Sequence, residues 1–250
     1  MSKDHTATEH DGPAYKAVAS RIENMLANGE LRPGDPLPNE TELAAQFDVN
    51  RSTIRESIRL LEDGGYIKRI SPRKLVASLP TPASLAERTS RALFITRATL
   101  RDVWEANLAI EPAMARVAAQ RATDAQKTAL RENIDATARR IERGEDLADL
   151  DEEFHALLGQ ASNQPALQIA REPFSALFLE VVDGLVHDLS VSDRLLVAHS
   201  RIVEAIERGD ADVAELWTRR HTLDFERGCK LAGVGIDVPL DQSVLKASAA

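Results

Sequence analysis

Residues 31–66 constrain the fold more than any other part of this 250-residue chain. The sequence there predicts a short helix over about residues 40–47, a tight bend at Asp48 and Val49, and a second helix opened by Asn50. Asn50 favours a helix start because its side-chain oxygen can accept hydrogen bonds from the free amides of the first turn. The pattern predicts a helix-turn-helix.

The second of these helices has an apolar face and a polar tip. Ile54, Ile58 and Leu61 recur four and three residues apart, which places them on one buried face. A helix fixed by its apolar side, with hydrogen-bond donors at its N-terminal tip, suits the major groove of double-stranded DNA. Arginines four residues apart more often form a solvated face, but the cap and the bend favour DNA binding here. The tip residues expected to contact DNA are Asn50, Arg51, Ser52, Thr53 and Arg55.

A small β wing is expected after this helix, because residues 66–79 read as two short strands around a turn at Ser71 and Pro72. Arg73 and Lys74 follow the turn, where their charges would reach DNA phosphates. With a further helix expected over residues 14–28, these elements predict a winged helix-turn-helix domain over residues 13–79. Residues 1–12 are expected to form a flexible tail.

The net charge of −9 does not exclude nucleic acid as a partner, because residues 48–76 carry seven basic and four acidic side chains. DNA binding requires a local basic surface rather than a basic chain. No apolar run approaches the length of a membrane span, and the polar N-terminus lacks the apolar core of a secretion signal. The single cysteine excludes an internal disulfide. We therefore expect a cytoplasmic protein without membrane contact.

The remainder of the chain has helical periodicity only, after a linker at residues 80–82. Helices are expected over residues 83–92, 99–121, 124–143, 147–160, 165–188, 191–208 and 210–231. The expected fold is therefore mainly α: a winged helix-turn-helix with a small β wing, then an all-α helical-bundle domain over residues 83–231. Residues 232–250 are expected to be a flexible tail.

Motifs spread over nearly the whole chain carry a family resemblance. Those of the N-terminal part lie at residues 31–38, 42–44, 49–56 and 61–65, and those of the helical part at residues 110–112, 151–155, 162–163, 199–202, 205–210 and 221. The first set resembles the GntR family of bacterial transcription regulators, and the second resembles the ligand-binding FCD domain of its FadR subfamily. The resemblance implies a homodimer that binds an inverted-repeat DNA operator, and a small-molecule effector that changes this binding.

Two positions depart from the family pattern. The wing tip carries Ser71, Pro72 and charged residues where the family usually has glycines, and Asn107 stands where the family usually presents an arginine that holds an effector carboxylate. Asparagine can hydrogen-bond an effector but lacks the charged, bidentate clamp of a guanidinium. We expect Asn107 and Asn163 to bind the effector, with an organic acid as its class. For Asn163, a helix-capping role is an equal alternative.

A metal site is expected in the helical domain. Asp151 and His155 are four residues apart, so both can face one cation from one helix. That pair alone is a weak signal, because such pairs often form an ordinary surface hydrogen bond. The resemblance adds His199 and His221 as two further imidazole ligands. Three imidazoles and one carboxylate suit a divalent ion such as zinc, nickel or manganese.

These observations favour an effector-responsive DNA-binding regulator, and a repressor in particular. One alternative is a metal-dependent hydrolase in which the same four ligands activate water, although no motif supplies a separate general base. Another alternative is a purely structural metal that stabilises the folded helical domain without affecting the response to an effector.

Overall fold

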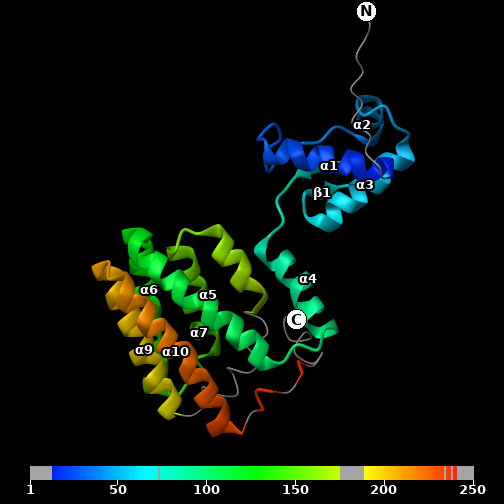
Figure 1. The fold of residues 1–250 in the computed structure, drawn as a ribbon. Coiled ribbons are helices and arrows are strands. Elements are labelled where there is room, and N and C mark those ends of the chain that lie inside the picture. The colour runs from blue at the N-terminus through cyan, green and yellow to red at the C-terminus, as the bar shows by residue number, and fades with distance from the viewer. Residues whose placement is uncertain (1–12, 73, 175–188, 234, 238, 241–250) are drawn as a thin grey trace, which may run out of the picture. The chain divides into compact units, whose positions relative to one another are not determined.

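The computed structural model describes residues 13–72, 74–174, 189–233, 235–237 and 239–240 (Figure 1). The chain forms two compact units, one up to Ser84 and one from Leu85 onward. The division falls inside helix α4 (Pro82–Ile95), just after the prolines at which the sequence predicts a linker. α4 is slightly longer at both ends than the sequence indicates.

The first unit is the winged helix-turn-helix that the sequence predicts. It contains α1 (Ala14–Ala27), α2 (Glu40–Gln46), α3 (Arg51–Gly64) and the antiparallel strands β1 (Ile67–Ser71) and β2 (Lys74–Ala77). α3 buries the apolar face expected of it. The buried core of the unit joins all three helices to the two strands through Val18, Ala19, Ile22, Leu43, Ile54, Ile58, Leu61, Ile67 and Leu75.

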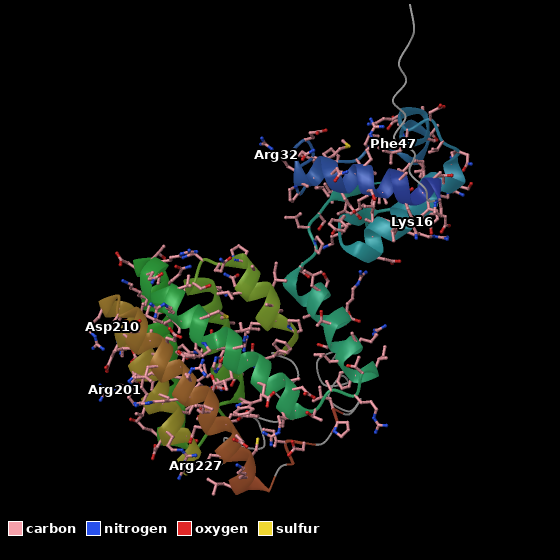
Figure 2. The ribbon with its side chains drawn as sticks, viewed as in Figure 1. Lys16, Arg32, Phe47, Arg201, Asp210 and Arg227 are labelled. Atoms are coloured by element: carbon pink, nitrogen blue, oxygen red, sulfur yellow. The ribbon has the colours of Figure 1, made fainter. Side chains whose placement is uncertain are left out.

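The bend before α3 and the end of α3 both depend on left-handed backbone. Asp48 has a φ of 52°, which reverses the chain between α2 and α3. Gly65 ends α3 at a φ of 78°, and a Cβ at this position would lie 3.1 Å from the Cα of Pro80. A glycine is therefore required where α3 meets the start of the wing. Phe47, labelled in Figure 2, follows α2. The guanidinium of Arg21 lies 5.5 Å from the centre of the Phe47 ring.

Helices make up most of the second unit in the part of it that the structure describes. α5 (Leu100–Arg121), α6 (Asp124–Arg143), α7 (Ala148–Ala161), α9 (Leu189–Arg208) and α10 (Ala211–Ala232) form its bundle, and residues 165–174 are also helical. α10 runs alongside α5 and α9, while α6 packs on α7 and α9 (Figure 1). Side chains of Thr99, Thr123 and Asp210 cap α5, α6 and α10. The rest of the helix expected over residues 165–188 lies outside the described residues.

The expectation of a flexible tail after residue 232 is wrong for residues 235–237, 239 and 240. Ile236 is buried in a cluster with Leu100, Trp104 and Cys229. Asp237 pairs with Arg101, and the backbone of residue 239 bridges to residue 99. The sequence signal is weak here because isolated apolar residues in a short segment have no helical or strand periodicity. The tail expected at residues 1–12 lies outside the described residues.

Candidate functional site

The tip of α3 is organised by Asn50. Its Oδ1 atom accepts hydrogen bonds from the backbone N–H of Thr53 at 2.8 Å, from the Ser52 hydroxyl at 2.6 Å and from the Thr53 hydroxyl at 3.0 Å. Asn50 is therefore an N-cap, and the two hydroxyl groups are held in fixed positions at the helix tip. Their oxygens keep lone pairs that could accept hydrogen bonds from base edges.

Two arginines of α3 share one carboxylate from α2. Arg55 Nε donates to Glu40 Oε2 at 2.8 Å, and Arg51 Nη2 lies 3.6 Å from the same oxygen. The hydrogen bond from Arg55 and the two positive charges lower the pKa of Glu40. Both arginine side chains remain more than half exposed. Because exposed ion pairs contribute little energy, these arginines can exchange Glu40 for a DNA phosphate at low cost.

The wing has the two antiparallel strands that the sequence predicts, with a register irregularity between Arg69 and Ser71. Lys74 is exposed and pairs with Ser71 across the strands, next to the turn. Arg69 instead pairs with Glu62 of α3 at 3.1 Å, which ties the wing to that helix. Arg73, the other wing residue expected to contact DNA, lies outside the described residues.

The four residues expected to bind metal lie together inside the helical unit. Asp151 and His155 come from α7, His199 from α9 and His221 from α10, and one ligand atom of each lies within 4.8 Å of the others. His221 Nε2 lies 3.1 Å from His199 Nε2 and 3.2 Å from His155 Nε2. Asp151 Oδ1 lies 3.4 Å from His199 Nε2 and 3.8 Å from His155 Nε2. The ring of Phe154 stacks on that of His199 with centroids 3.6 Å apart, which fixes its orientation.

Burial shifts the titration of this cluster. It raises the pKa of Asp151 to about 6 and lowers the pKa of His221 to about 4, the latter with help from the neighbouring His155. Burial and the other two imidazoles hold the pKa of His199 well below its usual range. Burial would also lower the pKa of His155, but Glu111 and Asp151 raise it overall. At neutral pH the cluster therefore presents neutral imidazoles from His199 and His221 and an ionised Asp151.

The geometry of the cluster fits a divalent cation. Metal–nitrogen distances of about 2.0–2.1 Å place tetrahedral ligand atoms about 3.3 Å apart, close to the shorter separations found here. Asp151 Oδ1 is buried and has no hydrogen-bond partner among the described residues. Converging Nε2 lone pairs and an unpartnered carboxylate oxygen are costly in a protein interior unless a cation satisfies them. The donor set and its geometry fit the metal that the sequence predicts.

A second layer of charged residues surrounds His155. Its Nδ1 atom lies 3.0 Å from Glu111 Oε1 of α5, and Arg171 Nε lies 3.3 Å from the same oxygen. Arg171 also binds both carboxylate oxygens of Glu152, at 2.7 and 2.8 Å. Burial alone would raise the pKa of Glu111, but His155 and Arg171 lower it to about 2. The sequence alone does not identify Glu111, Glu152 or Arg171 as site residues, because nothing in it links residue 171 to residue 111.

The two asparagines expected to bind an effector lie in different environments. Asn107 is buried on α5, one turn before Glu111, and its Oδ1 atom has no partner among the described residues. Asn163 is exposed and has a φ of 47°. Its amide nitrogen donates to the carbonyl of Arg121 at the end of α5 and to Gln126 at the start of α6. These contacts support the helix-capping alternative for Asn163, and its binding of an effector stays a prediction.

A surface groove between α9 and α10 reaches the cluster. Its volume is about 340 Å³, and His221 forms part of its wall together with Asp193, Arg194, Val197, Ala198, Trp217, Arg220 and Asp224. Arg194 and Asp224 form an ion pair at 2.8 Å across the two helices. The groove exposes one side of a candidate metal ligand to solvent.

A winged helix-turn-helix whose second helix is capped and exposed at its tip, joined to a helical domain with a buried Asp/His cluster, is the architecture of a DNA-binding transcription regulator. Comparison with known families agrees with this class. The family model for bacterial regulatory proteins of the gntR family matches residues 14–73, and that for the FCD domain matches residues 102–224. The chain belongs to the GntR family of bacterial transcription regulators and carries an FCD domain.

Individual relatives are regulators of the same kind. The chain is 26% identical over 216 residues to the HTH-type transcriptional repressor NanR of Cronobacter sakazakii, covering 82% of this chain and 80% of NanR. It is 26% identical over 207 residues to the HTH-type transcriptional regulator LutR of Bacillus subtilis, covering 81% of this chain and 94% of LutR. The solved structure of Streptococcus agalactiae GntR aligns with a TM-score of 0.64 at 25% identity, over 85% of this chain and 99% of that one.

These domains and relatives are those of transcription regulators and not of enzymes, so the hydrolase alternative is not supported. Among the described residues, no helix is both long enough and apolar enough to span a bilayer.

Proposed function

We propose that this regulator is a repressor that binds an inverted-repeat operator as a homodimer and responds to a small-molecule effector held at a divalent metal in the helical domain. The observation that carries this proposal is the convergence of Asp151 and three imidazoles on one buried point. In a DNA-binding regulator, a buried metal with open coordination positions is a natural receptor for a small ligand.

Zinc, nickel and manganese are the metals that this donor set favours. Asp151, His155, His199 and His221 would hold the ion, which would act as a Lewis acid toward an oxygen atom of the effector. The Phe154 ring fixes the plane of His199, and the four ligands come from three helices. Metal binding would therefore hold α7, α9 and α10 together, and an effector would act on a domain that the metal has ordered.

An organic acid is the effector class that this site favours. A carboxylate or hydroxyl oxygen would occupy an open position of the metal, while Asn107 would hydrogen-bond a second polar group. The unpartnered, buried Oδ1 of Asn107 supports this role, because such an atom gains a full hydrogen bond from a ligand donor. Without a guanidinium at position 107, recognition of the acid would depend mainly on the metal.

The DNA contacts of the proposal come from the tip of α3 and from the wing. Arg51 and Arg55 would exchange Glu40 for phosphates or base edges, and Asn50, Ser52 and Thr53 would present their polar groups to the groove. Arg73 and Lys74 would contact the phosphate backbone. A homodimer would place two such helices on the two halves of the operator.

Metal analysis by mass spectrometry tests the proposal, on the purified wild-type protein and on a His155→Ala, His199→Ala double variant. We expect nearly one equivalent of metal in the wild type and little in the variant. A thermal-shift screen of small organic acids should then stabilise only the metal-loaded wild type, and a stabilising acid should weaken operator binding. Absence of metal from the wild type would contradict the effector half of the proposal and leave its DNA-binding half intact.

A structural metal makes a different prediction for the same proteins. Chelation would then lower thermal stability, while acids would stabilise the metal-free and metal-loaded proteins equally. Coupling between metal occupancy and effector affinity therefore separates the two roles.

A further inference from the structure

The metal ligand His155 is the only one of the three imidazole ligands for which the described residues provide a carboxylate at Nδ1. Glu111 Oε1 lies 3.0 Å from this atom, and both side chains are almost completely buried. His199 Nδ1, by contrast, is buried with no carboxylate within 4 Å among the described residues, and its only ion-pair contact is that of Nε2 with Asp151. The two histidines are therefore oriented by different means, His199 by the stacked Phe154 ring and His155 by Glu111.

We propose that Glu111 is a positioning residue of the metal site and that Arg171 holds Glu111 in place, an inference that rests on the metal-binding function proposed above. Glu111 would keep the proton of His155 on Nδ1, which leaves the lone pair of Nε2 directed at the other three ligands. A carboxylate at the far nitrogen of a ligating histidine fixes its tautomer and ring orientation and increases its basicity.

Arg171 gives this carboxylate a fixed position. Only 6% of the Arg171 side chain is exposed, and its Nε lies 3.3 Å from the same Glu111 oxygen that faces His155. Its two terminal nitrogens bind Glu152, which neighbours Asp151 on α7. Arg171 lies in the helical residues 165–174, and its guanidinium connects Glu111 of α5 with Glu152 of α7. A buried arginine with two carboxylate partners has little freedom to move, so Glu111 keeps its distance from His155.

The position and pairing of Glu111 distinguish its role from that of the four metal ligands. Arg171 gives the buried Glu111 a cationic partner, and Glu152, which shares that partner, is 27% exposed and also reaches solvent. Glu111 faces Nδ1 of His155, the nitrogen opposite to the one that faces the cluster. It therefore acts on the metal through His155 and not as a ligand.

Glu152 provides a matched control, because Glu111 and Glu152 both pair with Arg171, whereas only Glu111 also pairs with a histidine of the cluster among the described residues. The experiment measures the zinc Kd by chelator competition for the wild type, Glu111→Gln and Glu152→Gln. Absorption spectra of the cobalt-substituted proteins report the coordination geometry. Circular dichroism and thermal unfolding of the metal-free proteins report whether each variant folds.

We expect Glu111→Gln to weaken zinc binding by about 10–100-fold, and to change the cobalt spectrum. Glu152→Gln should leave the zinc Kd and the cobalt spectrum close to those of the wild type, even if it changes the thermal stability of the metal-free protein. Glu111→Asp is measured alongside, because it keeps the charge and withdraws the carboxylate by one methylene. It should also weaken zinc binding, and it serves as the test variant if Glu111→Gln does not fold.

Equal effects of Glu111→Gln and Glu152→Gln on the zinc Kd would overturn the proposal, because the layer would then act only through packing around Arg171. A wild-type zinc Kd and cobalt spectrum in both Glu111 variants would also overturn it and leave the proposed metal site intact. A wild-type protein that binds neither zinc nor cobalt would overturn both proposals together.

Discussion

Two arginines show how differently the two units of this protein use the same side chain. Arg55 of the DNA-binding unit is 58% exposed and pairs with the single carboxylate of Glu40. Arg171 of the helical unit is 6% exposed and binds two carboxylates, Glu111 and Glu152. An exposed pair is weak and can be exchanged for a phosphate, whereas a buried pair cannot be opened without leaving a charge unsatisfied.

The other polar groups of the two sites differ in burial in the same way as the two arginines. Polar groups at the tip of α3 bond to one another at the surface, where water or DNA can replace any partner. The polar groups of the metal cluster are buried, and some of their atoms have no partner among the described residues. The first arrangement permits binding and release of a long polyanion. The second leaves buried polar atoms that one small cation would satisfy.

The largest expected difference between the two units is the loss of unfolding free energy when Arg171 or Arg55 is replaced by alanine. Arg171→Ala should lower the free energy of unfolding by about 3–5 kcal/mol, because the buried carboxylate of Glu111 and the partly buried one of Glu152 lose their cation. Arg55→Ala should lower it by less than about 1 kcal/mol, because its pair is exposed. Urea unfolding followed by circular dichroism measures both. Similar losses of unfolding free energy in the two variants would show that burial does not determine how much these ion pairs stabilise the protein.

Metal removal should have an effect of similar size on the helical unit. A metal present at about 1,000 times its Kd stabilises the folded state by about 4 kcal/mol, and chelation should remove this contribution. The measurement is thermal unfolding with and without a chelator, which can reach His221 through the groove between α9 and α10. The His155→Ala, His199→Ala variant is the control and should not respond. A wild type that is equally insensitive would argue against a bound metal.

Removing an exposed arginine from the tip of α3 should change the affinity for the operator more than it changes the free energy of unfolding. Arg51→Ala should weaken operator binding by about 1–3 kcal/mol, because a phosphate or base contact is lost. Arg59→Ala is the matched control, since Arg59 is also an exposed arginine of α3 but lies two turns further from the tip and pairs with Glu56. Fluorescence anisotropy with labelled operator measures both affinities. Unchanged affinity for Arg51→Ala would refute this placement of the recognition helix.

Acid should weaken metal binding at the buried site. The metal requires an ionised Asp151 and neutral imidazoles, and in the metal-free protein the pKa of Asp151 is about 6 while that of His155 is raised. Protons therefore compete with the metal as the pH falls, and its Kd should rise about tenfold or more for each pH unit below 6. Competition titrations between pH 7.5 and 5 test this. A Kd that stays constant over this range would mean that these groups are not the ligands.

The sequence predicted the DNA-binding unit nearly in full. The Asn50 cap, the bend at Asp48 and the apolar spacing of α3 are local signals, and each was confirmed within a residue or two. The periodicity of the helical unit also located its helices, although the packed segment around Ile236 was missed. The four metal-binding candidates came together as expected, but three of them were assigned through family resemblance and not through spacing alone.

Local sequence determined the elements of this protein, because capping, periodicity and turn chemistry act over a few residues that the chain itself keeps together. The layer behind the metal site was decided by tertiary structure alone. Glu111, Glu152 and Arg171 lie on different helical segments, and residues 111 and 171 meet only when the bundle closes. No pattern within one segment can specify such a contact, because its partners and its burial exist only in the folded domain.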